Sequence, residues 1–476
     1  MKLRLNYHFS TCVVIAWLVF FIVLFMNFSM AWIHKHFARV NLDEIALIMQ
    51  IGTTGVDSGL LSSFIKGVVR KSLIWSTVLA AVCYFMSYYK YIYVAVYVVL
   101  FVLLGYRTAV SNFQFGSFFQ VTSSDFYEKE YVDLETARIN FKNKRNVLFI
   151  VLESMEKQYA DEEMFGTGGL TPNLTKLAKK NVSFDRYNSL LGTNHTIAAI
   201  TGMVSGLPLF FSSFQNVEKM LGASGVGTIF KNNGYQTWSM FPASGTFSLK
   251  SNYLQRMGFD NIYDGHRLRK MLDHEIDVKP FGGVDDANLF KVTKPIISEI
   301  IKSKQPYFIL METINTHCDG YYTQACRDMG FAQENQEDIA KCEDKIIYDF
   351  IRWFRQQDPN AVVVLVDDHA QHTGGIMKKL RRAETRNLEN IFINTNLFSG
   401  VDTKRPIMAF DICPTLVEVA GAEIEGCRLG LGTSLTKRCA NVPTLRERFE
   451  DKELENIMKQ KNKLYYYLAT GKGEKK

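Results

Sequence analysis

The sequence lacks the patterns that mark several protein classes. No two cysteines have the C-x-x-C spacing, so a structural zinc site of that kind is not indicated. There is no internal repeat and no low-complexity tract, which argues against a repeat protein. The net charge of +7 is modest and is not clustered, so we expect no nucleic-acid partner. Beside a membrane, the same basic excess suits anionic lipid.

Charged residues are also missing from three stretches near the N-terminus. Residues 11–32 and 72–89 are each long enough to cross the hydrocarbon layer of a membrane. Residues 91–106 form a shorter uncharged stretch flanked by tyrosines, which suit the membrane interface. We expect three spans, the last two as a tight hairpin. Residues 42–64 contain three acids among moderately apolar residues and are expected to be interfacial or re-entrant, with a fourth span as the alternative.

The flanking charges indicate how the spans are oriented. Lys2 and Arg4 precede the first span, which keeps the N-terminus in the cytoplasm and places everything after Arg107 outside. The basic residues between 66 and 71 would then lie on the outer side, against the usual bias. The first stretch exceeds the apolar region of a signal peptide and has no A-x-A-like site, so cleavage is disfavoured. We therefore expect a multi-pass membrane protein with an extracytoplasmic domain.

Cysteine usage is compatible with an oxidising compartment. Six of the eight cysteines lie beyond the spans, an even number that suits disulfides. By proximity, Cys427 is expected to pair with Cys439. Cys326 has two candidate partners, Cys318 and Cys342. The cysteine within "AFDICPTLVEVAG" fits a helix and is expected to be a buried free thiol.

Beyond residue 145, two patterns alternate along the chain. Apolar runs, typical of strands buried in a parallel sheet, occur at "NVLFIVL", "GYQTWSM", "QPYFILM", "NAVVVLV" and "NIFINTN". Helical patterns lie between them, at 171–180, 287–302 and 336–357. The alternation predicts an α/β domain with a mostly parallel sheet flanked by helices. The expected organisation is a transmembrane region at 1–107, a stem or linker at 108–145, the α/β domain at 146–440 and a helical, basic tail at 441–476.

Two of the predicted strands end in acidic residues. Glu153 follows one strand, and Asp368 and His369 follow another. Because ligands bind at the carboxyl ends of strands in open α/β sheets, these side chains should converge. Two carboxylates and one imidazole suit a hard or borderline divalent cation such as manganese or zinc. For an isolated Asp-His pair, a strand followed by a plain polar turn would be the favoured alternative.

A fourth ligand is expected from the small-residue loop "LLGTNHTIAAITG". Thr196 stands there directly before a helix-like apolar run. A hydroxyl beside a metal at a helix N-terminus is deprotonated more easily, and the amide donors there favour an anion. Thr196 is therefore a candidate nucleophile and ligand, with an N-cap threonine as the alternative. Asp285 and Asp286 are expected to cap a helix rather than to reach an acceptor.

Eight motifs occur in an order that resembles one protein family. They are "KRNVLFIVLESME", "GLTPNLTKLAKKNVSFDRY", "LLGTNHTIAAITGMVSGLPL", "MGFDNIY", "ETINTHCDGY", "KCEDKIIYDFI", "VLVDDHAQH" and "RLGLGTSL". Over roughly residues 126–435 they look like the membrane-anchored phosphoglycerol transferases of the alkaline phosphatase/sulfatase superfamily. The likeness is greatest to the enzymes that decorate osmoregulated periplasmic glucans. Lipoteichoic acid synthases are similar but more distant.

The resemblance implies a role for each matching residue. Glu153, Asp368 and His369 match metal ligands. Thr196 matches the nucleophile, which is also a ligand. His317 matches a histidine that contacts the phosphate and can protonate the leaving alkoxide.

Three further residues are candidates for substrate contacts, namely Asn194, His195 and His372. His195 stands where relatives often carry tryptophan or lysine, and His372 has no matching position in the family. A structural histidine is the alternative for both. Asp367 occupies a position where the family commonly has serine. These departures bear on the acceptor and the head group rather than on the metal site.

The resemblance implies a transferase that moves phosphoglycerol from phosphatidylglycerol to an extracytoplasmic glycan through a covalent threonine intermediate. One divalent metal ion is implied, with manganese preferred and zinc or magnesium as alternatives. The place implied is the bacterial cytoplasmic (inner) membrane, with the catalytic domain in the periplasm and the lipid bilayer as a partner. Phosphoethanolamine transfer and a non-catalytic glycan- or lipid-binding protein are the alternative functions. Sulfate-ester hydrolysis is disfavoured because no cysteine lies in a C-x-P-x-R setting. The acceptor and the oligomeric state stay open.

Overall fold

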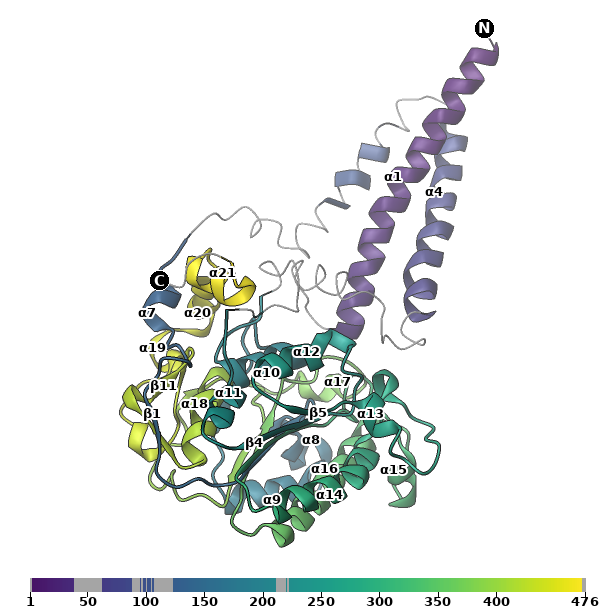
Figure 1. The fold of residues 1–476 in the computed structure, drawn as a ribbon. Helices are drawn as coiled ribbons and strands as arrows, with labels where there is room; N and C mark the ends of the chain where they lie inside the picture. The colour runs from purple at the N-terminus through teal and green to yellow at the C-terminus, as the bar shows by residue number, and fades with distance from the viewer. Residues whose placement is uncertain are drawn as a thin grey trace. The chain divides into compact units, whose positions relative to one another are not determined.

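The computed structural model describes most of the chain. The described residues are 2–37, 62–87, parts of 95–106, 123–210, 220 and 222–472. They fall into two compact units, one within residues 1–121 and one that runs from Thr122 to the C-terminus. Figure 1 shows both units, and each is described here by itself.

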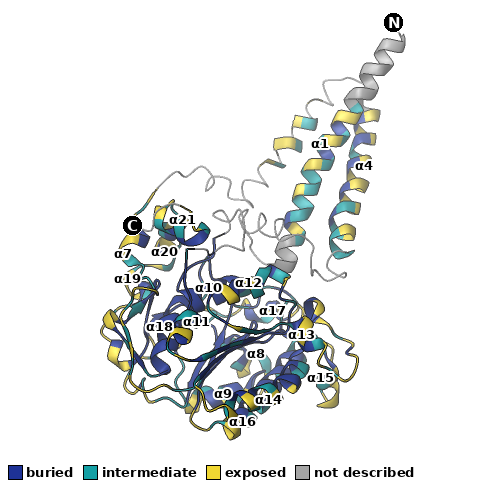
Figure 2. Cartoon of the chain, viewed as in Figure 1, coloured by how far each residue is buried: buried dark blue, intermediate teal, exposed yellow. Residues whose placement is uncertain are grey.

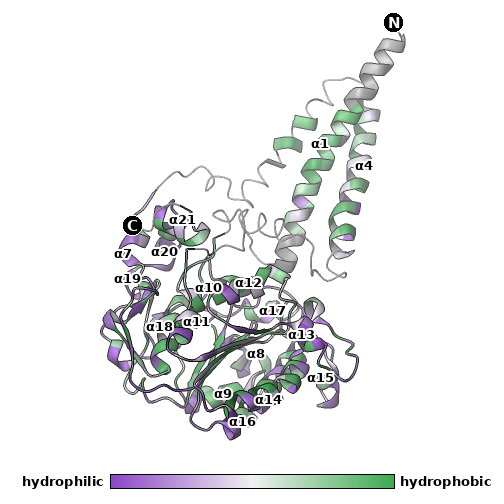
Figure 3. Cartoon of the chain, viewed as in Figure 1, coloured by the Kyte–Doolittle hydropathy of each residue, from purple (hydrophilic) through white to green (hydrophobic). Residues whose placement is uncertain are grey.

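The N-terminal unit is built from apolar helices. Helix α1 spans Lys2–Phe37, and a short π-helical segment, Ile65–Val69, leads into α4, Arg70–Ser87. Hydrophobic residues cover most of α1 and α4 (Figure 3). Two segments are long and apolar enough to cross a membrane, Val13–Trp32 and Ser62–Phe85. The second begins before residue 72, where the sequence placed its start, because the helix continues through the basic residues at 66–71.

The other predicted membrane segments are described only in part. Most of 42–64, and several residues of 91–106, lie outside the described residues. The described part of the latter packs against α1, since Phe101 and Tyr97 lie edge-on to Phe20 with ring centroids 4.9 and 6.0 Å away. These residues therefore belong to the same helical unit.

The second unit is organised around a six-stranded sheet, which confirms the predicted α/β class. Its order is β5 (Asn261–Tyr263), β4 (Gln236–Met240), β6 (Tyr307–Glu312), β2 (Val147–Leu152), β7 (Val362–Asp367) and β8 (Asn390–Ile393). All pairings are parallel except that of β7 with β8. Every residue of the three central strands is buried, as their uninterrupted apolar runs predict (Figure 2).

Helices cover both faces of this sheet. Alternate residues of β2 point to opposite faces, so Phe149 packs with one layer and Ile150 with the other. The first layer contains α10 (Thr196–Ser205), α11 (Val226–Asn232) and α18 (Ala409–Val419). The second contains α9 (Pro172–Lys180), α14 (Asp286–Lys302) and α16 (Gln336–Gln357). The three predicted helical segments all lie in the second layer.

Smaller elements complete the unit. The remaining strands form two-stranded pairs, β1 (Ile139–Phe141) with β10 (Ala422–Ile424), β3 (Arg186–Tyr187) with β9 (Pro406–Ile407), and β11 (Arg428–Leu429) with β12 (Gly432–Thr433). The short helices are α7 (Phe126–Glu130), α8 (Glu162–Phe165), α12 (Lys250–Arg256), α13 (Gly265–Arg269), α15 (Gln324–Asp328), α17 (Met377–Leu380), α19 (Leu445–Arg448), α20 (Asp451–Met458) and α21 (Lys463–Thr470).

Helices α7, α20 and α21 join the two ends of this unit. The Tyr127 hydroxyl donates to the carbonyl oxygen of Met458 over 3.0 Å, and the Tyr127 and Tyr465 rings lie 4.8 Å apart. All three side chains are buried in the same core as α10 and α18. The segments expected as a stem (108–145) and as a tail (441–476) thus both contribute packed elements to the unit, because each carries apolar residues that the core buries.

Two disulfides lie in this unit, Cys326–Cys342 and Cys427–Cys439. The first selects Cys342 over Cys318 as the partner of Cys326. Cys413 is a buried free thiol in α18, as expected.

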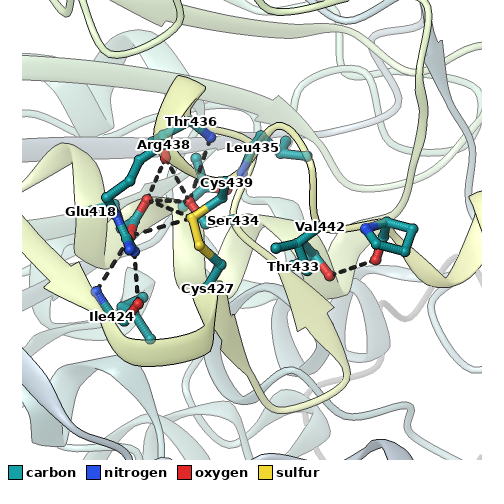
Figure 4. The surroundings of a disulfide bond; sticks show 12 residues. Glu418, Ile424, Cys427, Thr433, Ser434, Leu435, Thr436, Arg438, Cys439 and Val442 are labelled. Carbon is teal, nitrogen blue, oxygen red and sulfur yellow. Dashed lines mark hydrogen bonds and ion pairs between the residues drawn. A yellow bond between two sulfur atoms is a disulfide. The ribbon is translucent and has the colours of Figure 1, made fainter.

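The second disulfide lies against a buried carboxylate (Figure 4). Glu418 accepts a hydrogen bond from Ser434 Oγ over 2.6 Å and pairs with Arg438. Cys427 and Cys439 are bonded to each other, so this cluster has no thiolate to offer a metal.

Replacing Cys427 and Cys439 by serine is expected to lower the free energy of unfolding by about 2–3 kcal/mol, because the unfolded chain regains the entropy of a closed loop. Thermal unfolding of the full chain in detergent measures the effect. A reductant should lower the Tm of the native protein. It should not change the Tm of a variant in which all four disulfide cysteines are replaced. A reductant that lowers both alike would contradict the assignment.

A buried acid at the start of β8 makes stability depend on pH. Glu389 Oε1 accepts from the backbone N–H of Asn390 over 2.9 Å. Burial raises the pKa of Glu389 to about 7, although the Lys157 ammonium opposes the rise. The folded chain therefore keeps this proton at pH values where the unfolded chain, with a pKa near 4.3, has lost it.

Stability should consequently fall as pH rises from about 4.5 to 7, by roughly 1.4 kcal/mol per pH unit from this group alone. The Glu389→Gln variant has no proton to lose, so its Tm should fall less over this range and exceed that of the native protein at pH 8. Thermal unfolding at pH 5, 6, 7 and 8 compares the two. Parallel Tm profiles would refute the assignment.

Candidate active site

The acids that follow two neighbouring strands meet at one edge of the sheet. In the register of β2 with β7, Leu152 lies opposite Asp367, so Glu153 and Asp368 leave the sheet side by side. The backbone N–H of Ser154 donates to Asp368 Oδ1 over 3.0 Å. This hydrogen bond ties the turn after β2 to the turn after β7, as expected from parallel strands that end in acids.

Glu153, Asp368 and His369 form a buried cluster with the geometry of a cation site. His369 Nε2 lies 3.6 Å from Glu153 Oε1 and 3.4 Å from Asp368 Oδ2. One potential ligand atom from each residue lies within 4.8 Å of the others. Asp368 Oδ2 is buried and has no hydrogen-bond partner. Such an oxygen is costly unless a cation or donor satisfies it, so these residues fit a divalent metal ion.

The His369 ring is held in the orientation that a ligand needs. Its Nδ1 lies 3.1 Å from the carbonyl oxygen of Ala370 and donates to it. The proton therefore resides on Nδ1, which leaves the Nε2 lone pair directed at the two carboxylates.

Thr196 brings a hydroxyl into this cluster. Its Oγ1 donates to Glu153 Oε2 over 3.2 Å and lies 3.4 Å from His369 Nε2. Helix α10 has His195 as its N-cap, so Thr196 is the first helical residue and does not act as the N-cap. Small residues place the helix, since a Cβ on Gly202 would come within 2.9 Å of the Ala409 Cβ in α18.

A pocket adjoins Thr196. Its lining residues include Glu153, Thr196 and His317, together with Lys250 and Glu312. His317 therefore lines the same pocket as Thr196. Lys250 and Glu312 were not anticipated. Glu312 follows the same rule as Glu153, because it is the acid that ends a buried strand, and that signal could have identified it.

The backbone is strained directly after two of the site residues. Ser154 follows Glu153 with φ at 50°, and Cys318 follows His317 with φ at 55°. Residues other than glycine rarely adopt this left-handed conformation, which costs of order 1–3 kcal/mol at each position. The surrounding hydrogen bonds therefore fix the direction of the Glu153 and His317 side chains.

The close packing of acids shifts several pKa values. Burial and the neighbouring Glu153 raise the pKa of Asp368 to about 6. Burial lowers the pKa of His369, but Asp368 and Glu153 outweigh it and the pKa rises. Burial, followed by His369, lowers the pKa of His317 to about 4. His317 is therefore neutral at pH 7 and able to take up a proton.

The three remaining substrate-contact candidates lie in or against the loop before α10. Asn194 and His195 belong to the loop, and His372 contacts it. His372 Nε2 donates to the carbonyl oxygen of Asn194 over 3.1 Å, and its ring stacks on His369 with centroids 4.7 Å apart. Burial lowers the pKa of both His195 and His372 to about 3. Within the described part of the chain, the lining of the pocket includes His317 but not these three residues. Their contacts suit positioning of the loop better than substrate contact.

Asp285 and Asp286 stabilise backbone segments near the site through hydrogen bonds. Asp285 Oδ1 accepts from the backbone N–H of Asn288 over 3.2 Å and caps α14, as expected. Asp286 is buried and accepts from the N–H groups of Ile314 and Asn315, which precede His317. It therefore anchors the turn that carries His317.

Comparison with known proteins shows the family of the chain. The family model described as Sulfatase matches residues 145–422. Phosphoglycerol transferase I of Escherichia fergusonii is 28% identical over 261 residues, which are 52% of this chain and 33% of that protein. The enzyme of the same name from Escherichia coli O127:H6 is 29% identical over the same shares of the two chains. The match thus spans about a third of these relatives.

Solved structures share the fold. A protein in the alkaline phosphatase superfamily from Vibrio parahaemolyticus has a TM-score of 0.51 and 17% identity, covering 64% of this chain and 75% of that one. The lipooligosaccharide phosphoethanolamine transferase A of Neisseria meningitidis has a TM-score of 0.51 and 14% identity, covering 86% of each chain. Since the Sulfatase model covers more than half of the chain, this protein belongs to the sulfatase family and has an alkaline phosphatase/sulfatase-like fold.

Proposed function

We propose that this protein transfers phosphoglycerol from phosphatidylglycerol to an extracytoplasmic glycan, with Thr196 as nucleophile. One observation carries the proposal, namely that the Thr196 hydroxyl lies within hydrogen-bond distance of Glu153 and His369 in a cluster suited to one divalent cation. A pure binding protein has no use for a hydroxyl at this position. The phosphoglycerol transferases among the relatives support the choice of head group.

The site residues divide the reaction between them. Glu153, Asp368 and His369 hold the metal ion, for which manganese is our first choice, with zinc and magnesium as alternatives. When bound, such an ion lowers the pKa of a coordinated hydroxyl and neutralises charge on phosphate oxygens. Glu153 Oε2 already accepts the Thr196 hydrogen bond, so it is placed to receive the proton.

Two displacements then complete the transfer. Thr196 Oγ1 passes its proton to Glu153 and forms a bond to phosphorus, and the bond to the diacylglycerol oxygen breaks. The leaving oxygen takes a proton that His317 draws from water. A hydroxyl of the acceptor then attacks the phosphothreonine and gives its proton to the neutral His317 ring, and Thr196 leaves and regains its proton from Glu153.

The location proposed for this reaction is the outer face of the bacterial cytoplasmic membrane. The two disulfides of the catalytic unit suit an oxidising compartment such as the periplasm. The apolar helices of the N-terminal unit suit a protein that takes a lipid donor from the bilayer.

The mass of the covalent intermediate tests the proposal. The full chain in detergent is mixed with equal amounts of phosphatidylglycerol and phosphatidylethanolamine, quenched in acid and digested. We expect the peptide containing Thr196 to gain the mass of phosphoglycerol, and diacylglycerol to be released. A phosphoethanolamine mass at Thr196 would replace the proposed head group, and a modification at another residue would remove Thr196 from the mechanism.

A further inference from the structure

The pocket beside Thr196 contains a buried ion pair that the reaction above does not use. Lys250 Nζ pairs with Glu312 Oε2, and the side chains are only 7% and 3% exposed. Both residues line the pocket together with Thr196 and His317. A salt bridge buried this deeply gives little net stability, so its presence beside a nucleophile calls for another explanation.

One oxygen of this pair has no hydrogen-bond partner in the described part of the chain. Glu312 Oε1 is buried and accepts no hydrogen bond from any described residue. Lys250 offers the complementary group, because an ammonium carries three N–H donors and the pair with Glu312 uses one. The pocket wall thus presents an unused acceptor next to unused donors.

Both side chains are held in place by the backbone. Glu312 is the last residue of β6 and pairs with Val151 of β2, which lies two residues before Glu153. Lys250 follows two consecutive left-handed residues, Ser248 and Leu249, with φ at 53° and 52°. This strain at non-glycine residues fixes the first turn of α12 so that Lys250 points inward, with Nζ 5.2 Å from the centre of the Phe241 ring.

We propose that the Lys250–Glu312 pair recognises the uncharged, hydroxyl-bearing part of the transferred head group, an inference that rests on the proposed function. Glu312 Oε1 accepts a hydrogen bond from a hydroxyl of the head group, and Lys250 Nζ donates to a hydroxyl oxygen. The pair is neutral as a whole, which suits an uncharged polyol. An ethanolamine ammonium would lie against the Lys250 ammonium and would have no oxygen to accept from it.

Binding of head-group fragments tests this inference without turnover. Calorimetry measures the Kd of sn-glycerol 1-phosphate, phosphoethanolamine and inorganic phosphate for the full chain in detergent with Mn²⁺. We expect the native protein to bind glycerol phosphate about tenfold more tightly than phosphoethanolamine, as one charged hydrogen bond requires. The Glu312→Gln variant should reduce this preference to about threefold or less, without weakening inorganic phosphate.

Glu312→Gln leaves the Lys250 ammonium without its carboxylate and could disturb folding, so a second variant controls for this effect. The double variant Lys250→Met, Glu312→Leu removes both charges and should also lose the preference. Glu337→Gln is the matched control, because it breaks a lysine–glutamate pair on α16 that the pocket does not include. An unchanged preference in both pocket variants, or equal binding of the two fragments by the native protein, would overturn the inference.

Diacylglycerol release from phosphatidylglycerol is measured on the same samples. Release by the native protein tests the proposed function, whereas the ratio of the two Kd values tests the pocket. A native protein that prefers glycerol phosphate but releases no diacylglycerol would refute the proposed function and support the pocket assignment.

Discussion

Thr196→Ala is expected to abolish phosphoglycerol transfer, with kcat reduced at least about 10³-fold. The reason is that the Thr196 hydroxyl lies 3.2 Å from Glu153 Oε2 and 3.4 Å from His369 Nε2 in a residue that lines the pocket. The Ser154 hydroxyl also contacts Glu153 and His369, but it meets His369 at Nδ1 and Ser154 is not among the lining residues of the pocket. Binding of the lipid should persist, because the other residues that line the pocket do not change. Release of labelled diacylglycerol and binding to phosphatidylglycerol vesicles measure the two properties separately.

Two controls accompany this variant. Thr196→Ser keeps a hydroxyl and should retain measurable transfer. Thr201→Ala lies in the same helix, where the threonine hydroxyl donates to the carbonyl oxygen of Ile197, and should leave transfer near the native rate. Native turnover by Thr196→Ala would eliminate the covalent mechanism.

The second large effect is expected from Asp368→Asn. This change keeps the shape of the side chain but removes the charge of Asp368 Oδ2, which lies 3.4 Å from His369 Nε2 and has no hydrogen-bond partner among the described residues. We expect affinity for Mn²⁺ to fall by at least about 100-fold, and transfer to fall with it. Metal content after dialysis, measured by mass spectrometry, gives the affinity independently of the assay.

Asp367→Asn is the matched control for that experiment. Burial and the adjacent Asp368 raise the pKa of Asp367 well above its usual value, so a neutral amide resembles the form present in the fold. Its Oδ1 accepts from the N–H of Met155 over 2.7 Å, which an asparagine oxygen also does. Equal metal loss in both variants would refute the ligand assignment.

The centre of the sheet and the metal-site cluster follow from short-range sequence patterns. Unbroken apolar runs predicted β2, β6 and β7, and the residue types at their ends predicted where Glu153 and Asp368 meet. Edge strands carry weaker patterns. The three residues of β5 are only half-buried and were not anticipated.

Lys250 shows why the rest of the pocket could not be predicted. It is the first residue of α12 and reaches the pocket because the two residues before it, Ser248 and Leu249, are left-handed. Neither residue type signals that conformation, which only the packed surroundings enforce. Glu312, in contrast, ends a buried strand and was open to prediction. Pairing of Cys326 also needed the fold, since sequence distance did not separate Cys318 from Cys342.

The junction of α7 with α20 and α21 has a consequence for biogenesis. Tyr127 is buried in the core only when Met458 and Tyr465 are present to pack against it. While a ribosome is still adding the residues of α20, the hydrophobic surface around Tyr127 stays uncovered. Completion of the core thus waits for the synthesis of α20 and α21, and a nascent chain halted before Asp451 would expose that surface to chaperones and proteases.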